Sequence, residues 1–384
     1  MTSTAPTGLE ALRPEARLLH TLATPRWSDE ADALARHILT GQRELDWSYF
    51  LDQALRHHVV PLIGRNLQYS RVWQPQEDGV LIPYPWIYVA AYEANSRRNR
   101  ALFGEFRRIF HDLGRAGIRH AVRKGPVLCH TVYDDAGTRR MADLDLLIEE
   151  ESFPEVSGVL SELGYAQGLH SANGAVITPY ARSTRAFWSM HLNNKLPFKK
   201  PTSDPDVDFF EVDLCLNLFQ RKSRGAADTR TLLDRSVPLR MCGTDARALA
   251  PADHLLDVCL HLYKEATSHL SIERGKDITL QRFLDVAESV RLMDSGAAKE
   301  FTALASRSGA EREVYFALAF ARRLYPDAVP ESLAESLRPD DLGYLDEYGE
   351  LDGKAGRWTT AFLDRLFDPD RRGQVVGSST IPHQ

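Results

Sequence analysis

Two aspartates interrupt one apolar segment of the chain, residues 141–148. In a β-strand alternate side chains share a face, so Asp143 and Asp145 would project together and the apolar residues around them would pack on the other side. Two carboxylates in an otherwise buried strand repel each other and are costly to desolvate. A divalent cation would neutralise them, and oxygen-rich sites suit Mg²⁺, often with a substrate phosphate completing its shell. The segment therefore predicts a strand that carries a magnesium site.

A strand followed by a tight turn is predicted upstream of the two aspartates. Residues 118–126 predict the strand and turn, and residues 127–133 predict a helix. Gly125 allows the backbone to approach a ligand closely, and Pro126 suits the first position of a helix. Free N–H groups at a helix start can bind phosphate, and nearby cations would strengthen that contact. The cations predicted to do so are Lys124, Arg139 and Arg140.

A second acidic segment follows at residues 208–218. Its alternating pattern places Glu211 and Asp213 on one face of a strand. Asp213 is a candidate third carboxylate on a strand beside the first. Three carboxylates around one or two metal ions support in-line displacement at phosphorus. The alternatives are a half-exposed strand face for Asp213 and ordinary surface cations at Lys124 and Arg139.

Together these motifs resemble the uncharacterised nucleotidyltransferase family, a branch of the DNA polymerase β-like nucleotidyltransferase superfamily. The similarity lies in Lys124-Gly125, then Arg139, then Asp143-x-Asp145 followed by apolar residues. The eighteen-residue step from Gly125 to Asp143 fits that branch, and Asp213 matches its later acidic strand. Weaker similarity extends over approximately residues 15–325, including residues 45–51, 57–62 and 255–262.

The resemblance implies an α+β fold, in which a mixed β-sheet core is flanked by an N-terminal helical region and a C-terminal helical domain. It implies that Gly125 lies in a phosphate-binding turn, and that Asp143 and Asp145 bind Mg²⁺ or Mn²⁺. Asp213 would complete the acidic triad as a metal ligand and help to deprotonate the acceptor hydroxyl.

The activity implied by the resemblance is transfer of a nucleoside monophosphate from a nucleoside triphosphate such as ATP, with release of pyrophosphate. Similar proteins occur beside natural-product and polysaccharide genes, which favours a small-molecule or peptide acceptor. Alternatives are a protein- or tRNA-modifying enzyme of the toxin–antitoxin type, and an inactive nucleotide-binding module. The chain departs from the family pattern at Pro126, where Gly or Ser is common, and at Cys215, where His is common.

Helical periodicity surrounds the predicted sheet and divides the chain into three regions. We expect an N-terminal helical region at residues 1–112, a nucleotidyltransferase core at residues 113–222 and a C-terminal helical domain at residues 245–375. The C-terminal helices begin at Pro251, and the paired residues His57 and His58 are predicted to end an N-terminal helix without a catalytic role.

Three local elements are predicted between the two acidic strands. A helix should run from residue 153 to residue 163, because Gly164 is a common stop signal. Residues 190–196 predict a further strand. Residues 199–205 predict a turn, because they combine two lysines with two prolines and polar residues.

The helix predicted near residues 251–264 carries two different stripes. Its apolar side comprises Leu255, Leu256, Cys259, Leu260 and Tyr263, and its opposite side comprises His254, Asp257, His261 and Lys264. A helical domain packed across the sheet commonly completes a nucleotide cleft, so His261 and Lys264 are candidate contacts for the triphosphate or the acceptor. The alternative, which we favour, is an ordinary solvated or interdomain face. A zinc site is disfavoured because no cysteine stands at ligand spacing.

Composition narrows the partners and the compartment. The 384 residues carry a formal charge of −6, from 47 basic and 53 acidic side chains, and no basic tail. Because a nucleic-acid partner normally requires a basic footprint, DNA or RNA is disfavoured. Four scattered cysteines without a C-x-x-C pair predict reduced thiols in a cytoplasmic protein. No apolar run approaches membrane-spanning length, and the N-terminus has no secretory pattern.

The other common catalytic motifs are missing from the sequence. It contains no P-loop, no G-x-G-x-x-G turn, no G-x-S-x-G elbow and no H-E-x-x-H helix. A P-loop kinase, a dinucleotide-dependent oxidoreductase, an α/β-hydrolase and a zinc protease of that type are therefore disfavoured.

Overall fold

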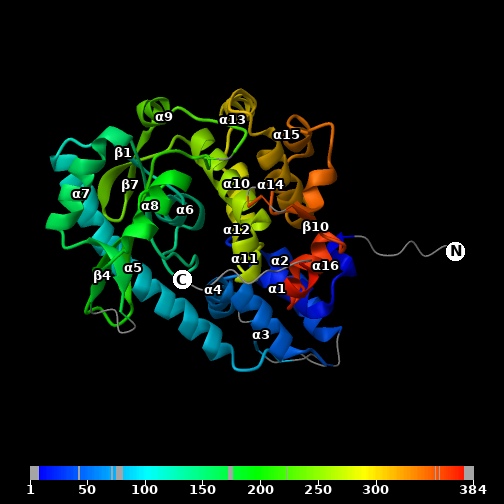
Figure 1. Ribbon diagram of the computed structural model, residues 1–384. Coiled ribbons are helices and arrows are strands. Elements are labelled where there is room, and N and C mark those ends of the chain that lie inside the picture. Colours follow the sequence, from blue (N-terminus) through cyan, green and yellow to red (C-terminus); the bar gives the residue numbers. More distant parts are fainter. Residues whose placement is uncertain are drawn as a thin grey trace. The chain divides into compact units, whose positions relative to one another are not determined.

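A large mixed sheet and many helices make up the chain, which confirms the predicted α+β class (Figure 1). The computed structural model describes residues 8–41, 44–70, 72–74, 81–171, 176–221, 223–350, 352–353 and 355–375. The chain divides into two units. The first comprises Met1–Val89, His261–Ala287 and Glu311–Gln384, and the second comprises Ala90–Leu260 and Glu288–Ala310.

The first unit is mainly helical. Its elements are α1 (Pro14–Leu22), α2 (Asp29–Thr40), α3 (Trp47–Arg56), α4 (Val60–Ser70), α11 (His269–Glu273), α14 (Glu311–Leu324), α15 (Glu331–Glu335), α16 (Phe362–Leu366), β9 (Glu347–Tyr348) and β10 (Gly356–Arg357). His57 follows α3 as its capping residue, which is the helix-end position that the sequence predicts. Its imidazole is buried, and Nδ1 accepts a hydrogen bond from the Leu280 N–H at 3.2 Å.

The second unit is built on the mixed sheet. Its strands are β1 (His120–Val122), β2 (Leu144–Ile148), β3 (Ala166–His170), β4 (Ile177–Pro179), β5 (Phe198–Pro201), β6 (Phe209–Cys215), β7 (Val237–Met241) and β8 (Thr244–Ala248). Among the described residues the order is β4-β3-β5-β6-β2-β1-β8-β7. β2 is parallel to β6 and β1 is parallel to β8, whereas the other neighbours are antiparallel. The strand that follows Asp143 therefore lies in the interior of the sheet.

The second unit also contains helices, most of which connect these strands along the chain. They are α6 (Gly125–Leu128), α7 (Phe153–Glu162), α8 (Arg182–His191), α9 (Thr229–Arg235) and α13 (Ser295–Arg307). The boundary between the units falls inside α5 (Pro85–Arg115), α10 (Pro251–Thr267) and α12 (Leu280–Arg291). The predicted helix after the acidic strand is confirmed as α7, and Gly164 follows it with a φ of 88°.

Two local predictions are wrong. Residues 190–196 are not a strand, because Met190 and His191 end α8 and only Asn194 forms an isolated bridge, with Cys215. The helical hydrogen bond from Leu192 N–H to Trp188 O, at 3.0 Å, shows that the helical period prevails over the apparent alternation.

The predicted turn at residues 199–205 is wrong in its first part. β5 extends to Pro201 and pairs with β6. The two lysines fit a strand because acidic partners neutralise them. Lys199 Nζ lies 3.3 Å from Glu211 Oε2, and Lys200 Nζ lies 2.6 Å from the buried Glu105 carboxylate.

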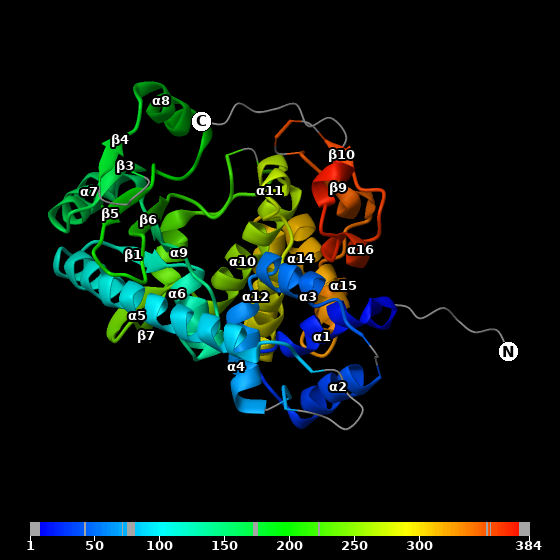
Figure 2. The same ribbon diagram turned by 90° about the horizontal axis from the view of Figure 1, so that it is seen from below.

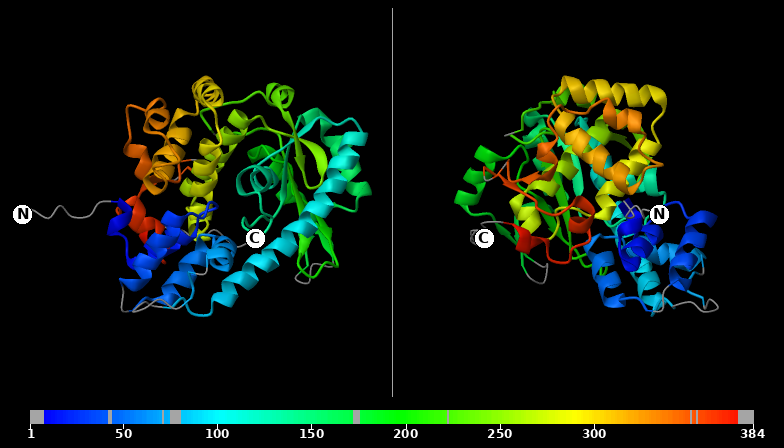
Figure 3. Two further views of the ribbon diagram at one scale, coloured as in Figure 1. Left: turned by 180° about the vertical axis from the view of Figure 1, so that it is seen from behind. Right: turned by 90° about the vertical axis from the view of Figure 1, so that its right-hand side faces the viewer.

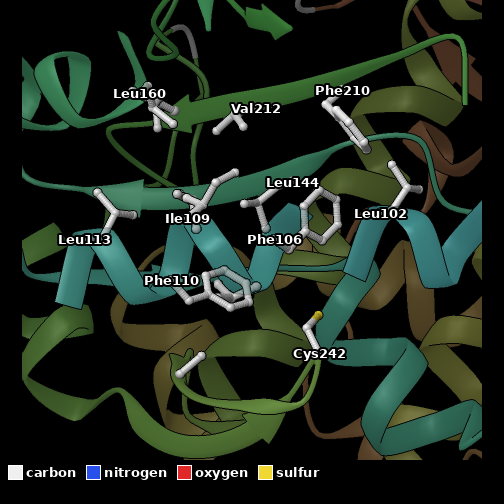
Figure 4. Close-up of a cluster of buried hydrophobic side chains, with 14 of the residues drawn as sticks. Leu102, Phe106, Ile109, Phe110, Leu113, Leu144, Leu160, Phe210, Val212 and Cys242 are labelled. Carbon is white, nitrogen blue, oxygen red and sulfur yellow. The ribbon is translucent and has the colours of Figure 1, made fainter. Parts of the chain in front are cut away.

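One face of the sheet packs against α5 and α7, which lie side by side in Figure 2. Figure 3 shows α5 as one continuous helix along the strands. Leu144 of β2 and Val212 of β6 are fully buried on this face. Figure 4 shows the α5 side chains that meet them, Leu102, Phe106, Ile109 and Leu113. Because side chains alternate along a strand, the carboxylates of β2 and β6 project from the opposite face.

The structure also bears on the predictions about membrane-spanning segments and cysteines. Among the described residues, every helix is too short or too polar to cross a membrane. The four cysteines, which the sequence predicts to be reduced, are all buried; they are Cys129, Cys215, Cys242 and Cys259.

A buried ion pair attaches the first half of α10 to the sheet. Arg123, directly after β1, donates from Nε to Asp257 Oδ2 at 3.0 Å and from Nη2 to Oδ1. Both side chains are almost completely buried. Burial acts to raise the pKa of Asp257, but the charge and hydrogen bonds of Arg123 outweigh it and the pKa is lowered. The Arg123 N–H also donates to Asp145 O at 3.1 Å, so the pair is tied to the acidic strand.

Breaking this pair from one side should destabilise the protein. Asp257→Leu leaves a buried guanidinium without its carboxylate, which costs about 3–5 kcal/mol. The double variant Arg123→Met/Asp257→Leu removes both charges, and most of the lost stability should return. Urea unfolding followed by circular dichroism measures both variants against the parental protein. A double variant no more stable than Asp257→Leu would contradict this account.

Candidate active site

Four carboxylates lie along one face of two adjacent strands. The parallel register of β2 and β6 sets Asp145 opposite Asp213. Asp143 directly precedes β2, and Glu211 stands two residues before Asp213 on β6. Because the side chains alternate, all four project from the face opposite the α5 core. The structure thus brings together the three aspartates that the sequence predicts.

Three of these carboxylates form a close group. Oxygen atoms of Asp143, Glu211 and Asp213 all lie within 4.8 Å of one another. Asp213 Oδ1 is buried and has no hydrogen-bond partner among the described residues. Glu211 is absent from the set predicted from the sequence, although its alternation with Asp213 was the signal that could have added it. Lys199 of β5 supplies its counter-charge at 3.3 Å.

Asp145 has a different environment, because a lysine is bound to it. Lys124 Nζ donates to Asp145 Oδ1 at 3.0 Å, and both side chains are mostly buried. The Cys215 thiol lies 3.9 Å from the same oxygen. Lys124 has a φ of 48°, an uncommon value for a residue with a Cβ, and such backbone strain is enriched at functional sites. The predicted Lys124 therefore lies at the site, but it contacts a carboxylate.

Gly125 and Arg139 meet beside this ion pair. A Cβ on Gly125 would lie 3.0 Å from Met141 Cγ and 3.6 Å from Arg139 Nη1. Only glycine leaves room for the Met141 side chain without a shift, and Arg139 lies beside the turn. Arg140 is exposed. The predicted helix start is present as the four-residue α6, and its phosphate contact remains a prediction.

The group carries unfavourable negative charge. Burial, followed by the charge of Asp145, raises the pKa of Asp143 to about 7, whereas Lys124 and Arg139 act to lower it. Burial and the charges of Asp143 and Asp145 raise the pKa of Asp213 well above its ordinary value. An added cation at this face would relieve both effects.

Tyr180, after β4, also lies in the field of these carboxylates. Burial, followed by the charges of Glu211 and Asp213, raises the pKa of its phenol to about 12. No sequence pattern connects this tyrosine to the acidic strands, because β4 is separated from β6 by β3 and β5 in the sheet.

The polar stripe predicted on α10, which comprises His254, Asp257, His261 and Lys264, crosses the boundary between the two units. The favoured alternative is a solvated or interdomain face, and its solvated form is wrong for His254 and Asp257, which belong to the second unit and are buried. The cause is visible at Asp257, which is bound by Arg123. His261 and Lys264 belong to the first unit, and their nucleotide contact remains a prediction.

A family of known proteins matches this chain. The sequence profile of a family described as uncharacterised nucleotidyltransferase matches residues 43–326, which is more than half of the 384 residues. No curated protein matches the chain. The profile spans both acidic strands, the Lys124-Gly125 turn and the whole of α10. The chain therefore belongs to the uncharacterised nucleotidyltransferase family.

Proposed function

We propose that this protein is a Mg²⁺-dependent nucleotidyltransferase. It transfers a nucleoside monophosphate from a nucleoside triphosphate to a small-molecule or peptide acceptor and releases pyrophosphate. The observation that carries the proposal is the group of Asp143, Glu211 and Asp213, whose oxygens lie within 4.8 Å of one another beside Asp145. A chain gains nothing in stability from four neighbouring carboxylates, so their retention favours a cation as their partner.

The donor set fits a hard divalent cation. All the available atoms are carboxylate oxygens, which Mg²⁺ and Mn²⁺ prefer, and Asp213 Oδ1 is buried without a partner among the described residues. Asp143, Asp145 and Asp213 would hold the ion, with Glu211 beside them. When bound, the ion supplies charge neutralisation of the polyphosphate and of the developing charge at phosphorus.

The protein's own groups have separate tasks in this reaction. A bond forms between the acceptor oxygen and the α-phosphorus, and the bond from that phosphorus to the pyrophosphate oxygen breaks. Asp213 accepts the acceptor's proton, because a cation bound at this face would keep its carboxylate ionised and therefore able to act as a base. Lys124 and Arg139 offset negative charge on the phosphate oxygens.

The net charge of the protein indicates the chemical class of the acceptor. The formal charge of −6 disfavours a polynucleotide. A small hydroxyl-, phosphate- or carboxylate-bearing molecule or a peptide requires no such footprint, and the buried thiols suit a reducing cytoplasm.

The double variant Asp143→Asn/Asp145→Asn tests the activity. It keeps side-chain volume but removes two anionic ligands, so pyrophosphate release from Mg²⁺ and any of the four nucleoside triphosphates should fall at least about 100-fold. Circular dichroism should show an unchanged fold. Undiminished turnover in this variant would falsify the proposed function.

Removing one carboxylate should stabilise the protein when metal is absent. Asp143 has a folded pKa of about 7, above its unfolded value, so its stabilising effect is present at low pH and is lost as pH rises through about 7. In a chelator at pH 8, Asp143→Asn should therefore be about 1–3 kcal/mol more stable than the parental protein. The difference should disappear near pH 4. Equal stability at pH 8 would show that carboxylate repulsion is unimportant there.

Lys124 should compete with the metal ion for the Asp145 carboxylate and should strengthen binding of the nucleoside triphosphate. Lys124→Met frees Asp145, so Mn²⁺ affinity without nucleotide should rise by about threefold to tenfold. Triphosphate affinity should fall, because a nearby positive charge is lost. Calorimetry measures both, with Lys195→Met as the control, since Lys195 pairs instead with the exposed Glu150 at 2.8 Å. A drop in Mn²⁺ affinity for Lys124→Met would contradict the competition between Lys124 and the metal ion for Asp145.

A further inference from the structure

The loop of residues 134–142 leads into the acidic strand. It joins the π-helix Cys129–Tyr133 to β2 and carries Arg139. Its last residue directly precedes Asp143. The conformation of this loop therefore sets the positions of Arg139 and Asp143 in the candidate site. Helix α5 binds the loop through its backbone carbonyl groups, from residues that the sequence analysis did not select.

Two buried asparagines of α5 make most of these contacts. Asn99 Nδ2 donates to the carbonyl oxygens of Ala136 and Arg139, at 2.7 and 2.8 Å. Asn95 Nδ2 donates to the Gly137 carbonyl oxygen at 2.8 Å. Asn99 is 0% exposed and Asn95 is 7% exposed. Because their partners are backbone atoms, these contacts fix the path of the loop whatever its side chains do.

Arg98 fixes the end of the loop nearest the carboxylates. Its Nη1 donates to the Met141 carbonyl oxygen, two residues before Asp143. Burial, followed by the charge of Arg140, lowers the pKa of Arg98, while the Asp143 carboxylate acts to raise it. The guanidinium thus holds the backbone at Met141 and lies within the electrostatic field of Asp143.

The start of the loop is fitted to the same helix. Tyr92 Oη donates to Asp135 Oδ2 at 3.0 Å. A Cβ on Gly137 would lie only 2.2 Å from the Tyr92 ring, so glycine is required for the loop to pass this close. The fit is specific to this pair of surfaces.

The asparagines occupy positions where packing alone would favour apolar residues. They continue the stripe that α5 buries against the sheet, and the stripe changes from polar to apolar where it leaves the loop. Its members in order are Tyr92, Asn95, Asn99, Leu102, Phe106, Ile109 and Leu113. A buried amide is costly unless it is hydrogen-bonded, so the polar half of the stripe matches the loop's carbonyls.

We propose that Asn95, Arg98 and Asn99 are positioning residues, which hold the loop so that Arg139 and Asp143 face the same polyphosphate and metal ion. We call this set the α5 clamp. The proposal rests on the proposed function for the roles of Arg139 and Asp143. The clamp acts through the loop backbone, so its loss should weaken ligand binding at the site without removing any ligand-binding group.

The test compares four variants by binding. Arg98→Met and Asn99→Ala remove clamp donors, and Arg98→Lys keeps a cationic donor. Arg97→Ala is the matched control, because Arg97 is the neighbour on α5 but is exposed and pairs with Asp206 at 3.2 Å. The probes are Mn²⁺ alone, and Mn²⁺ with whichever of the four ribonucleoside triphosphates most raises the thermal stability of the parental protein. Calorimetry is performed well below the unfolding temperature of each variant.

Arg98→Met and Asn99→Ala should each lower both affinities about tenfold, the usual effect of removing a group that orients a ligand. Arg98→Lys should recover part of the loss, and Arg97→Ala should match the parental protein. Hydrogen exchange should increase at residues 134–142 in the two clamp variants. Asn99→Ala removes the donor to two loop carbonyls. If Asn99→Ala does not fold, Arg98→Met carries the test.

Two results would overturn the clamp. One is a lower unfolding temperature with parental affinities for Mn²⁺ and triphosphate, which is the outcome of a purely structural role. The other is a parental protein that binds neither probe, which would also remove the proposed function. If the parental protein binds both probes and the clamp variants bind them weakly, the clamp stands even where no transfer of nucleotide is detected.

Discussion

The repulsion between carboxylates on β2 and β6 is an unfavourable interaction that the rest of the second unit must offset. A parallel register sets Asp145 opposite Asp213, so like charges are neighbours across the strands. Such pairing is destabilising in a sheet. The cations close to it, Lys124, Lys199 and Arg139, come from three different segments, which indicates that the surrounding fold is arranged around this charge. The apolar face of the same strands supplies the packing that offsets it.

The two aspartates of one motif are not equivalent in this structure. Asp145 forms an ion pair with a mostly buried lysine, whereas burial and the charge of Asp145 raise the pKa of Asp143. Alternation alone would give them the same role, since both project from one face. The difference comes from Lys124, whose strained backbone places its ammonium at one carboxylate. Strain of this kind persists only where neighbouring structure fixes it, as the Asp145 contact does here.

The resemblance to the family implied the fold class. Local patterns in the sequence predicted the acidic strands and the helix α7, because each depends on a period or a stop signal within a few residues. They failed at β5, where two lysines beside a proline resemble a turn, since the acids that neutralise them are distant in sequence. The same limit applies to Asp257, which looked like part of a solvated face and is bound by Arg123. The roles of the site residues remain proposals.

Helix α5 shows how one element can serve packing and site geometry together. Its buried stripe is apolar where it meets the sheet and polar where it meets the loop before Asp143. An apolar residue in place of Asn99 would leave two loop carbonyls without donors, so the polar choice is dictated by the loop. The same helix packs on Leu144 and donates a hydrogen bond to the Arg139 carbonyl oxygen. It therefore holds the strand and the loop in a fixed position relative to each other. Asp143 stands where these two constraints meet, and its place beside Glu211 and Asp213 follows from both.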